Sequence, residues 1–125
     1  MKNIYGIVFL IISISSYAQN ALNFDGINDY VQAANAGPAG SSSRTVELWV
    51  NPSYIPSTQT VFVDWGAMAL GNRFTLNMIN GTPRIEIGGS GLNATTSITV
   101  GNWYHIAATF DNGASTKYKI YVNAK

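Results

Sequence analysis

The sequence predicts an all-β protein, an antiparallel sandwich of two packed sheets, on three observations. Beyond residue 18 the chain is rich in Thr, Val, Ile, Tyr, Phe and Trp. Turn-forming residues (Gly, Asn, Asp, Pro or Ser) interrupt these stretches about every eight to twelve residues, which is typical of sandwiches and barrels. Several segments alternate apolar and polar side chains with a period of two, and none sustains the helical period of about 3.6 residues.

Residues 1–18 have the features of a secretory signal peptide. Lys2 supplies a positive charge, residues 4–14 are almost unbroken apolar sequence, and Ser16 and Ala18 are small residues before a cut at Gln19. The alternative is a membrane anchor, but a spanning helix needs about 20 apolar residues, roughly twice this run. We therefore expect an exported protein whose residues 19–125 form one domain, with no membrane insertion after cleavage.

Composition excludes several functions. The chain has seven Lys and Arg residues and six Asp and Glu residues, so its formal net charge is +1. This balance argues against nucleic acid or an anionic membrane as a partner, because both need a concentrated basic surface. The chain has no Cys, which removes disulfides, thiolate zinc sites and thiol chemistry. Burial and backbone hydrogen bonds must hold the fold.

The period-two alternation locates individual strands. It is clearest over residues 45–50, 73–79, 84–87 and 117–122. One face of each segment is apolar and must leave water, at about 25 cal/mol per Å² of apolar area buried. Only an opposing sheet can cover these faces, so two layers follow.

Two turns predict how neighbouring strands pair. Asn80-Gly81 lies between two alternating segments, and both residues tolerate the positive φ angles of a tight hairpin. Asp111-Asn112-Gly113 joins residues 103–110 to residues 117–122 through a longer loop. We expect an antiparallel hairpin at each place.

Three segments carry a resemblance to a known family. They are ALNFDGINDYV at residues 21–31, TVELWVNP at 45–52, and NWYHIAATFD at 102–111 followed by KIYVN at 119–123. In this order they resemble LamG-like jelly-roll domains of the laminin G and concanavalin A-like lectin/glucanase class. The resemblance implies a jelly-roll β-sandwich of two antiparallel sheets. The end of the signal peptide, Tyr17-Ala18-Gln19, is similar to those of Bacteroidetes-type secreted proteins.

The sequence departs from the family pattern near its end. Ala124 stands where the family usually has Gly after YVN, so the geometry of the turn there is expected to differ from that of the family. Family domains usually continue for several strands beyond this point. The resemblance therefore implies a domain that is incomplete at the C-terminus, after Lys125.

The residues do not predict an enzyme. Related glycosidases place carboxylates two positions apart on one strand, whereas Glu47 and Glu86 have no acidic neighbour at that spacing. Arg84 shares the face of Glu86 and would keep it ionised, so Glu86 would be a poor general acid. The single histidine, His105, is expected to be a structural, hydrogen-bonded residue within a strand.

A calcium site is one interpretation of the turn carboxylates Asp25, Asp29 and Asp111. Calcium takes several hard oxygen ligands from such loops. The resemblance also implies a calcium site at a rim of the sandwich, where related domains often bind this ion. The favoured alternative is that each Asp bonds its own backbone in an Asx turn. No other cofactor is expected.

Aromatic and polar residues predict a carbohydrate site. Tyr54 and Trp65 are the aromatic candidates at the rim, where rings stack on the apolar faces of sugars. Trp49 and Trp103 lie in strand patterns and are expected to pack in or near the core. The polar side chains expected to line a concave sheet and bond hydroxyl groups are Arg73, Asn77, Arg84 and Glu86.

These observations favour a non-catalytic extracellular or cell-surface recognition module within a larger protein. Its expected partner is a glycan or a surface glycoprotein. The alternatives are a structural or cell-adhesion spacer that binds protein and not sugar, and, less favoured, an accessory domain of a glycoside hydrolase. Fold resemblance alone does not decide among them.

Overall fold

The structure is a computed structural model that describes residues 20–35, 37–38, 40–67, 69, 72–87 and 90–125. The predicted signal peptide, residues 1–18, lies outside the described residues. The chain divides into two units between Gln32 and Ala33. In the first unit, residues 20–32 form neither strand nor helix.

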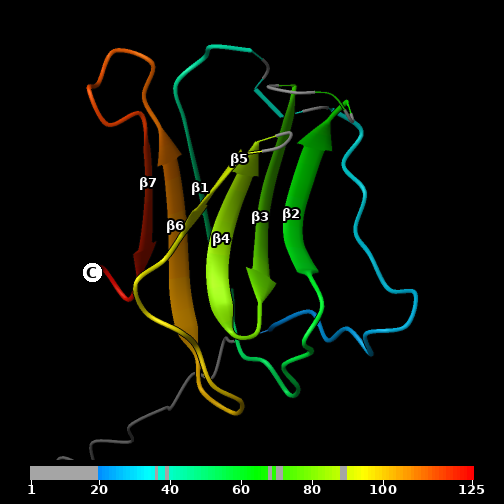
Figure 1. Cartoon of the computed structure of the whole chain (residues 1–125). Coiled ribbons are helices and arrows are strands. Elements are labelled where there is room, and N and C mark those ends of the chain that lie inside the picture. Colours follow the sequence, from blue (N-terminus) through cyan, green and yellow to red (C-terminus); the bar gives the residue numbers. More distant parts are fainter. Residues whose placement is uncertain (1–19, 36, 39, 68, 70–71, 88–89) are drawn as a thin grey trace, which may run out of the picture. The chain divides into compact units, whose positions relative to one another are not determined.

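The second unit contains all seven strands of the described residues (Figure 1). They are β1 (Arg44–Val50), β2 (Thr60–Gly66), β3 (Arg73–Ile79), β4 (Thr82–Ile87), β5 (Ser90–Asn93), β6 (Tyr104–Phe110) and β7 (Tyr118–Val122). The described part contains no helix, and therefore none long and apolar enough to span a bilayer. The all-β prediction is confirmed.

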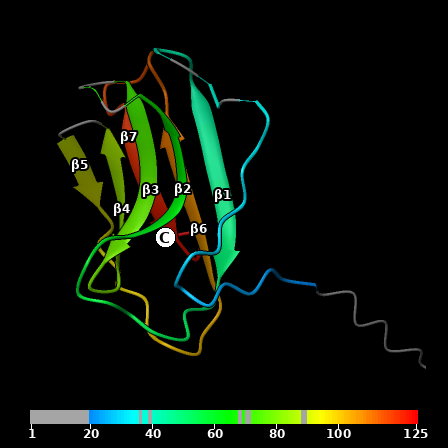
Figure 2. The ribbon, with the colours of Figure 1, turned by 90° about the vertical axis from the view of Figure 1, so that its right-hand side faces the viewer.

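The strands form two antiparallel sheets that pack face to face (Figure 2). One sheet has three strands in the order β1-β6-β7, and the other has four in the order β2-β3-β4-β5. Both predicted hairpins are confirmed, β3 to β4 and β6 to β7. Asn80 and Gly81 have φ angles of 50° and 77°, the conformation that an Asn-Gly pair adopts with little strain.

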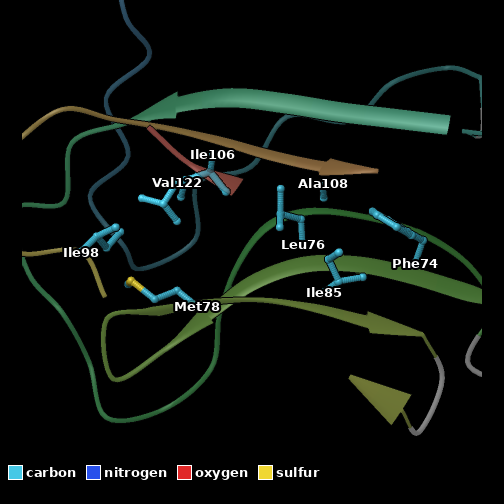
Figure 3. Packing of buried hydrophobic residues seen from close by; sticks show 8 residues of the cluster. All are labelled: Phe74, Leu76, Met78, Ile85, Ile98, Ile106, Ala108 and Val122. Carbon is cyan, nitrogen blue, oxygen red and sulfur yellow. The ribbon is translucent and has the colours of Figure 1, made fainter. Parts of the chain in front are cut away.

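The core lies between the two sheets (Figure 3). Leu76 of β3 and Ile85 of β4 face each other in register and are fully buried, as is Ile106 of β6 from the other sheet. Period-two alternation explains this arrangement, because it sends every second side chain of each strand inward. The buried apolar cluster comprises Phe74, Leu76, Met78, Ile85, Ile98, Ile106, Ala108 and Val122.

A β-bulge in β2 changes which of its side chains reach the core. The pairing with β3 shifts between Val61 and Val63, so Phe62 is the extra residue. Phe62 and Val63 both pack against the core as a result. Beyond the bulge, Asp64 returns to the face of the sheet that points away from the core.

The turn after β7 uses positive φ angles without glycine. Asn123 and Ala124 have φ angles of 51° and 62°. Asn123 tolerates this conformation well, and its Oδ1 accepts a hydrogen bond of 3.0 Å from the His105 backbone N–H. Alanine has no such compensation, so Ala124 carries the backbone strain that the family's usual glycine avoids.

The predicted burial of Trp49 and Trp103 is wrong, since these side chains are 64% and 52% exposed. Trp49 stands between Leu48 and Val50, which pack against the core. Alternation therefore forces its indole to the outer face of β1. Trp103 lies just before β6, where it is not enclosed by either sheet.

Candidate functional site

The outer face of the four-stranded sheet is lined by polar side chains from four strands. Cross-strand register places Asp64, Thr75 and Glu86 in one row, and Asn77, Arg84 and Asn93 in the next. Alternation brings the residues of β3 and β4 together on this face, whereas Asp64 and Asn93 join them through the pairing of β2 with β3 and of β5 with β4. We call this surface the polar face; its residues are Asp64, Arg73, Thr75, Asn77, Arg84, Glu86 and Asn93.

An ion pair occupies one end of the polar face. The Arg73 guanidinium bonds both carboxylate oxygens of Asp64, with its Nε donating to Oδ1 at 2.8 Å. The Thr75 hydroxyl donates to the same Oδ1 at 3.0 Å. The hydrogen bond from Arg73 is the main reason that the pKa of Asp64 lies below its ordinary value of 3.8, with Thr75 adding to the effect and burial opposing it.

We expect this ion pair to make stability depend on pH in acid. A carboxylate whose pKa is lowered in the folded state stabilises the fold fully above its unfolded pKa of 3.8. That contribution should disappear as the pH falls below 3.8 and through the lower folded pKa. Denaturant unfolding of the wild type and of Asp64→Asn across this range should show a steeper acid loss in the wild type. Parallel profiles would contradict the assignment.

Glu86 lies at the centre of a second polar network. Its Oε2 accepts hydrogen bonds from Gln59 Nε2 at 3.0 Å and from Asn77 Nδ2 at 3.3 Å. Arg84 Nε lies 3.9 Å from the same oxygen, which is an ion pair and too long for a hydrogen bond. The carboxylate is thus fixed in place by one cation and two amides.

Arg84 lies across the neighbouring strand and not out into solvent. Its Nη1 donates to Asn93 Oδ1 at 2.9 Å. Glycine at position 91 makes this possible, since a Cβ there would be 2.1 Å from Arg84 Nη2. The Arg84 Nε is buried and, among the described residues, has no hydrogen-bond partner.

Asn77 is the least expected member of the polar face. It is 0% exposed, yet its Oδ1 has no hydrogen-bond partner among the described residues. A buried carbonyl without a donor costs about 1–3 kcal/mol. Asn77 pairs directly with Arg84 in the register, so an unused acceptor and an unused donor come from paired positions.

The two aromatic candidates differ in their surroundings. Trp65 stacks on Phe74 with a centroid distance of 4.5 Å, and its Nε1 donates to the Pro38 carbonyl at 2.9 Å. These contacts make it a packing residue with little free surface for a ligand. Tyr54 is 73% exposed in the loop between β1 and β2, and no described contact joins it to the polar face.

The carboxylates proposed for calcium close their own turns. Asp29 Oδ2 accepts from the Asp25 N–H at 2.9 Å, and Asp25 Oδ1 accepts from the Ile27 N–H at 2.8 Å. Asp111 Oδ1 accepts from the Gly113 N–H at 3.0 Å. The described ranges contain no group of three or more His, Cys, Asp or Glu that could hold a metal ion. Calcium binding stays a prediction.

Alternation placed Arg73, Asn77, Arg84 and Glu86 on one face, but it missed their partners. Asp64 follows the bulge in β2, which hides the phase of that strand in the sequence. Asn93 lies in the short segment SGLN, which shows no alternation. Only the cross-strand register reveals that these residues join the site.

The described part of the chain is an antiparallel β-sandwich whose core fills the space between two sheets and whose four-stranded sheet carries a bonded polar network on its outer face. Comparison with known families matches residues 25–125 to the family described as the concanavalin A-like lectin/glucanases superfamily, a laminin G-type family. The chain belongs to this family. No curated protein and no solved structure matches the chain.

Proposed function

We propose that this protein is an exported, non-catalytic recognition module that binds a neutral glycan on its polar face. The observation that carries the proposal is the buried Oδ1 of Asn77, which lacks a donor on a strand pair where Arg84 Nε lacks an acceptor. Each hydroxyl group of a sugar both donates and accepts. Adjacent hydroxyls can therefore satisfy both atoms once Arg84 shifts to admit them.

The charge of the polar face favours an uncharged ligand. Asp64 and Glu86 carry two negative charges, and Arg73 and Arg84 carry two positive charges, so the face is neutral overall. The side chains of these residues are between 26% and 35% exposed, so their charges are partly removed from water. A charged sugar would lie near both carboxylates and guanidinium groups, so its attraction to one would be offset by repulsion from the other.

The same contacts argue for binding and against hydrolysis. Glycosidases need one carboxyl group that is protonated near neutral pH, and this requires a raised pKa. Arg73 lowers the pKa of Asp64 instead. Glu86 is held by two amide donors and lies 3.9 Å from Arg84, and among the described residues it has no second carboxylate beside it to share the work of acid and nucleophile.

A glycan array that carries neutral and acidic oligosaccharides tests the proposal. We expect binding to neutral structures, and Arg84→Ala should weaken it about tenfold because it removes a charge-assisted hydrogen bond. Lys125→Ala deletes an exposed lysine from the chain end and should leave binding intact. If no neutral glycan binds, or if Arg84→Ala binds as well as the wild type, the proposal is wrong.

A further inference from the structure

The outer face of the three-stranded sheet carries a second set of functional groups. Its register places Thr45, Thr109 and Lys119 in one row and Glu47, Ala107 and Tyr121 in the next. Trp49 pairs with His105 in a third row, two residues further along each strand. We call this surface the second face; its residues are Thr45, Glu47, Trp49, His105, Ala107, Thr109, Lys119 and Tyr121.

A basic depression of about 560 Å³ lies at the Lys119 end of the second face. Its lining includes three cations, Arg44, Lys117 and Lys119, and one carboxylate, Asp111, for a net charge of +2. Arg44 donates to backbone carbonyls, and Lys117 donates to Asn112 Oδ1 at 3.0 Å. No acceptor among the described residues bonds the Lys119 ammonium, which lies in the row of the Thr45 and Thr109 hydroxyls.

An aromatic platform lies at the other end. Trp49 is largely exposed, and its ring lies 5.2 Å from that of His105 at a tilt of 44°. His105 Nε2 lies 3.4 Å from Oε2 of Glu47, so the imidazole that borders the indole lies beside a carboxylate. Trp103, two residues before His105, adds a second exposed ring near this end. An indole with polar groups at its edge suits the apolar face and the hydroxyls of a sugar ring.

Strand geometry fixes the separation of the two ends. Thr109 and His105 are four residues apart on β6, about 14 Å at the rise of an antiparallel strand. Trp49 and Lys119 pair with them from opposite sides of β6, which adds about 10 Å across the sheet and gives a diagonal of about 17 Å between the two ends. Ala107 lies midway and presents only a methyl group, so a bound chain can cross the sheet there. We propose that the second face binds an oligosaccharide with a neutral ring on Trp49 and an acidic sugar, bearing a carboxylate or a sulfate, at Lys119.

Glu47 narrows the class of ligand further. Its exposed carboxylate lies between the two ends, where it would repel a negative charge on the middle of a bound chain. A glycan with one terminal acidic sugar avoids this repulsion, whereas a uniformly sulfated polymer does not. The inference is independent of the proposed function, which concerns the opposite sheet.

The test is a glycan array with neutral, sialylated, uronic-acid-terminated and singly sulfated oligosaccharides, together with heparin. The full chain should bind a subset with one terminal acid, and the sialylated, uronic and sulfated members distinguish carboxylate from sulfate. Lys119→Ala should lower that affinity about tenfold, because a charge-assisted bond is lost. Trp49→Ala should lower it by a similar order, and Trp49→Phe should retain part of it because it keeps an aromatic ring.

The controls separate this surface from the polar face. Lys125→Ala removes the same charge elsewhere and should change nothing, and Arg84→Ala should affect only neutral glycans. Melting temperatures close to that of the wild type show that the exposed-site variants remain folded. The inference is overturned if no acidic glycan binds, if heparin binds more tightly than the singly charged glycans, or if Lys119→Ala and Trp49→Ala bind acidic glycans normally.

Discussion

Replacement of Leu76 by alanine is expected to lower the free energy of unfolding by about 2–5 kcal/mol. Leu76 is fully buried at the centre of the four-stranded sheet, between Val63 on β2 and Ile85 on β4. The smaller side chain removes apolar burial and leaves a cavity that the rigid sheet cannot close. Total stabilities of domains are about 5–15 kcal/mol, so this one change can remove a large part.

A matched variant in the same sheet provides the control. Val61→Ala also shortens an apolar side chain, but Val61 is 46% exposed on the outer side of β2. We expect it to change stability by no more than about 0.5 kcal/mol, as for most surface substitutions. Urea unfolding of both variants measures the difference. Equal losses would mean that the space between the two sheets is not the core.

Alternation predicted the strands that lack irregularities. β1, β3, β4 and β7 each keep a strict period of two, and the Asn80-Gly81 turn fixes how β3 meets β4. β2 and β5 were harder to predict for physical reasons. A bulge breaks the period-two alternation of β2. β5 has no apolar alternation at all, and it forms a strand because its backbone pairs with β4.

The tryptophans show where residue type misleads. A large aromatic ring suggests burial, but the phase of β1 decides for Trp49, and the inward positions were already taken by Leu48 and Val50. Trp65 was expected at a rim, yet it stacks on Phe74. Side-chain phase within a strand was a better guide than hydrophobicity, and contacts across strands could not be read from either.

The unsatisfied oxygen of Asn77 is the part of the site that no sequence pattern reveals. Asn77 follows the period-two alternation of β3, and this alternation predicts only that its side chain lies on the outer face of the sheet. Its complete burial and its missing partner are properties of the folded sheet, in which Asn77 Nδ2 donates to Glu86 and Asn77 Oδ1 is left without a donor among the described residues. In the proposed function, the glycan supplies the donor that this oxygen lacks.

Asn77→Leu is therefore expected to abolish glycan binding with little loss of stability. Leucine has the same number and branching of non-hydrogen atoms and removes a buried acceptor that has no donor, which offsets the lost hydrogen bond to Glu86. Glu86 keeps its bond from Gln59. The free energy of unfolding should stay within about 1 kcal/mol of the wild type or rise, while the variant can no longer accept a hydrogen bond from a sugar hydroxyl.

The central claim is that the polar face is built for recognition and not for support of the fold. Its most direct test is a paired measurement on Asn77→Leu, namely the melting temperature and the affinity for a neutral glycan that the wild type binds. We predict an unchanged or higher melting temperature together with lost affinity. A marked fall in melting temperature with affinity retained would show that Asn77 supports the fold and that the glycan binds elsewhere.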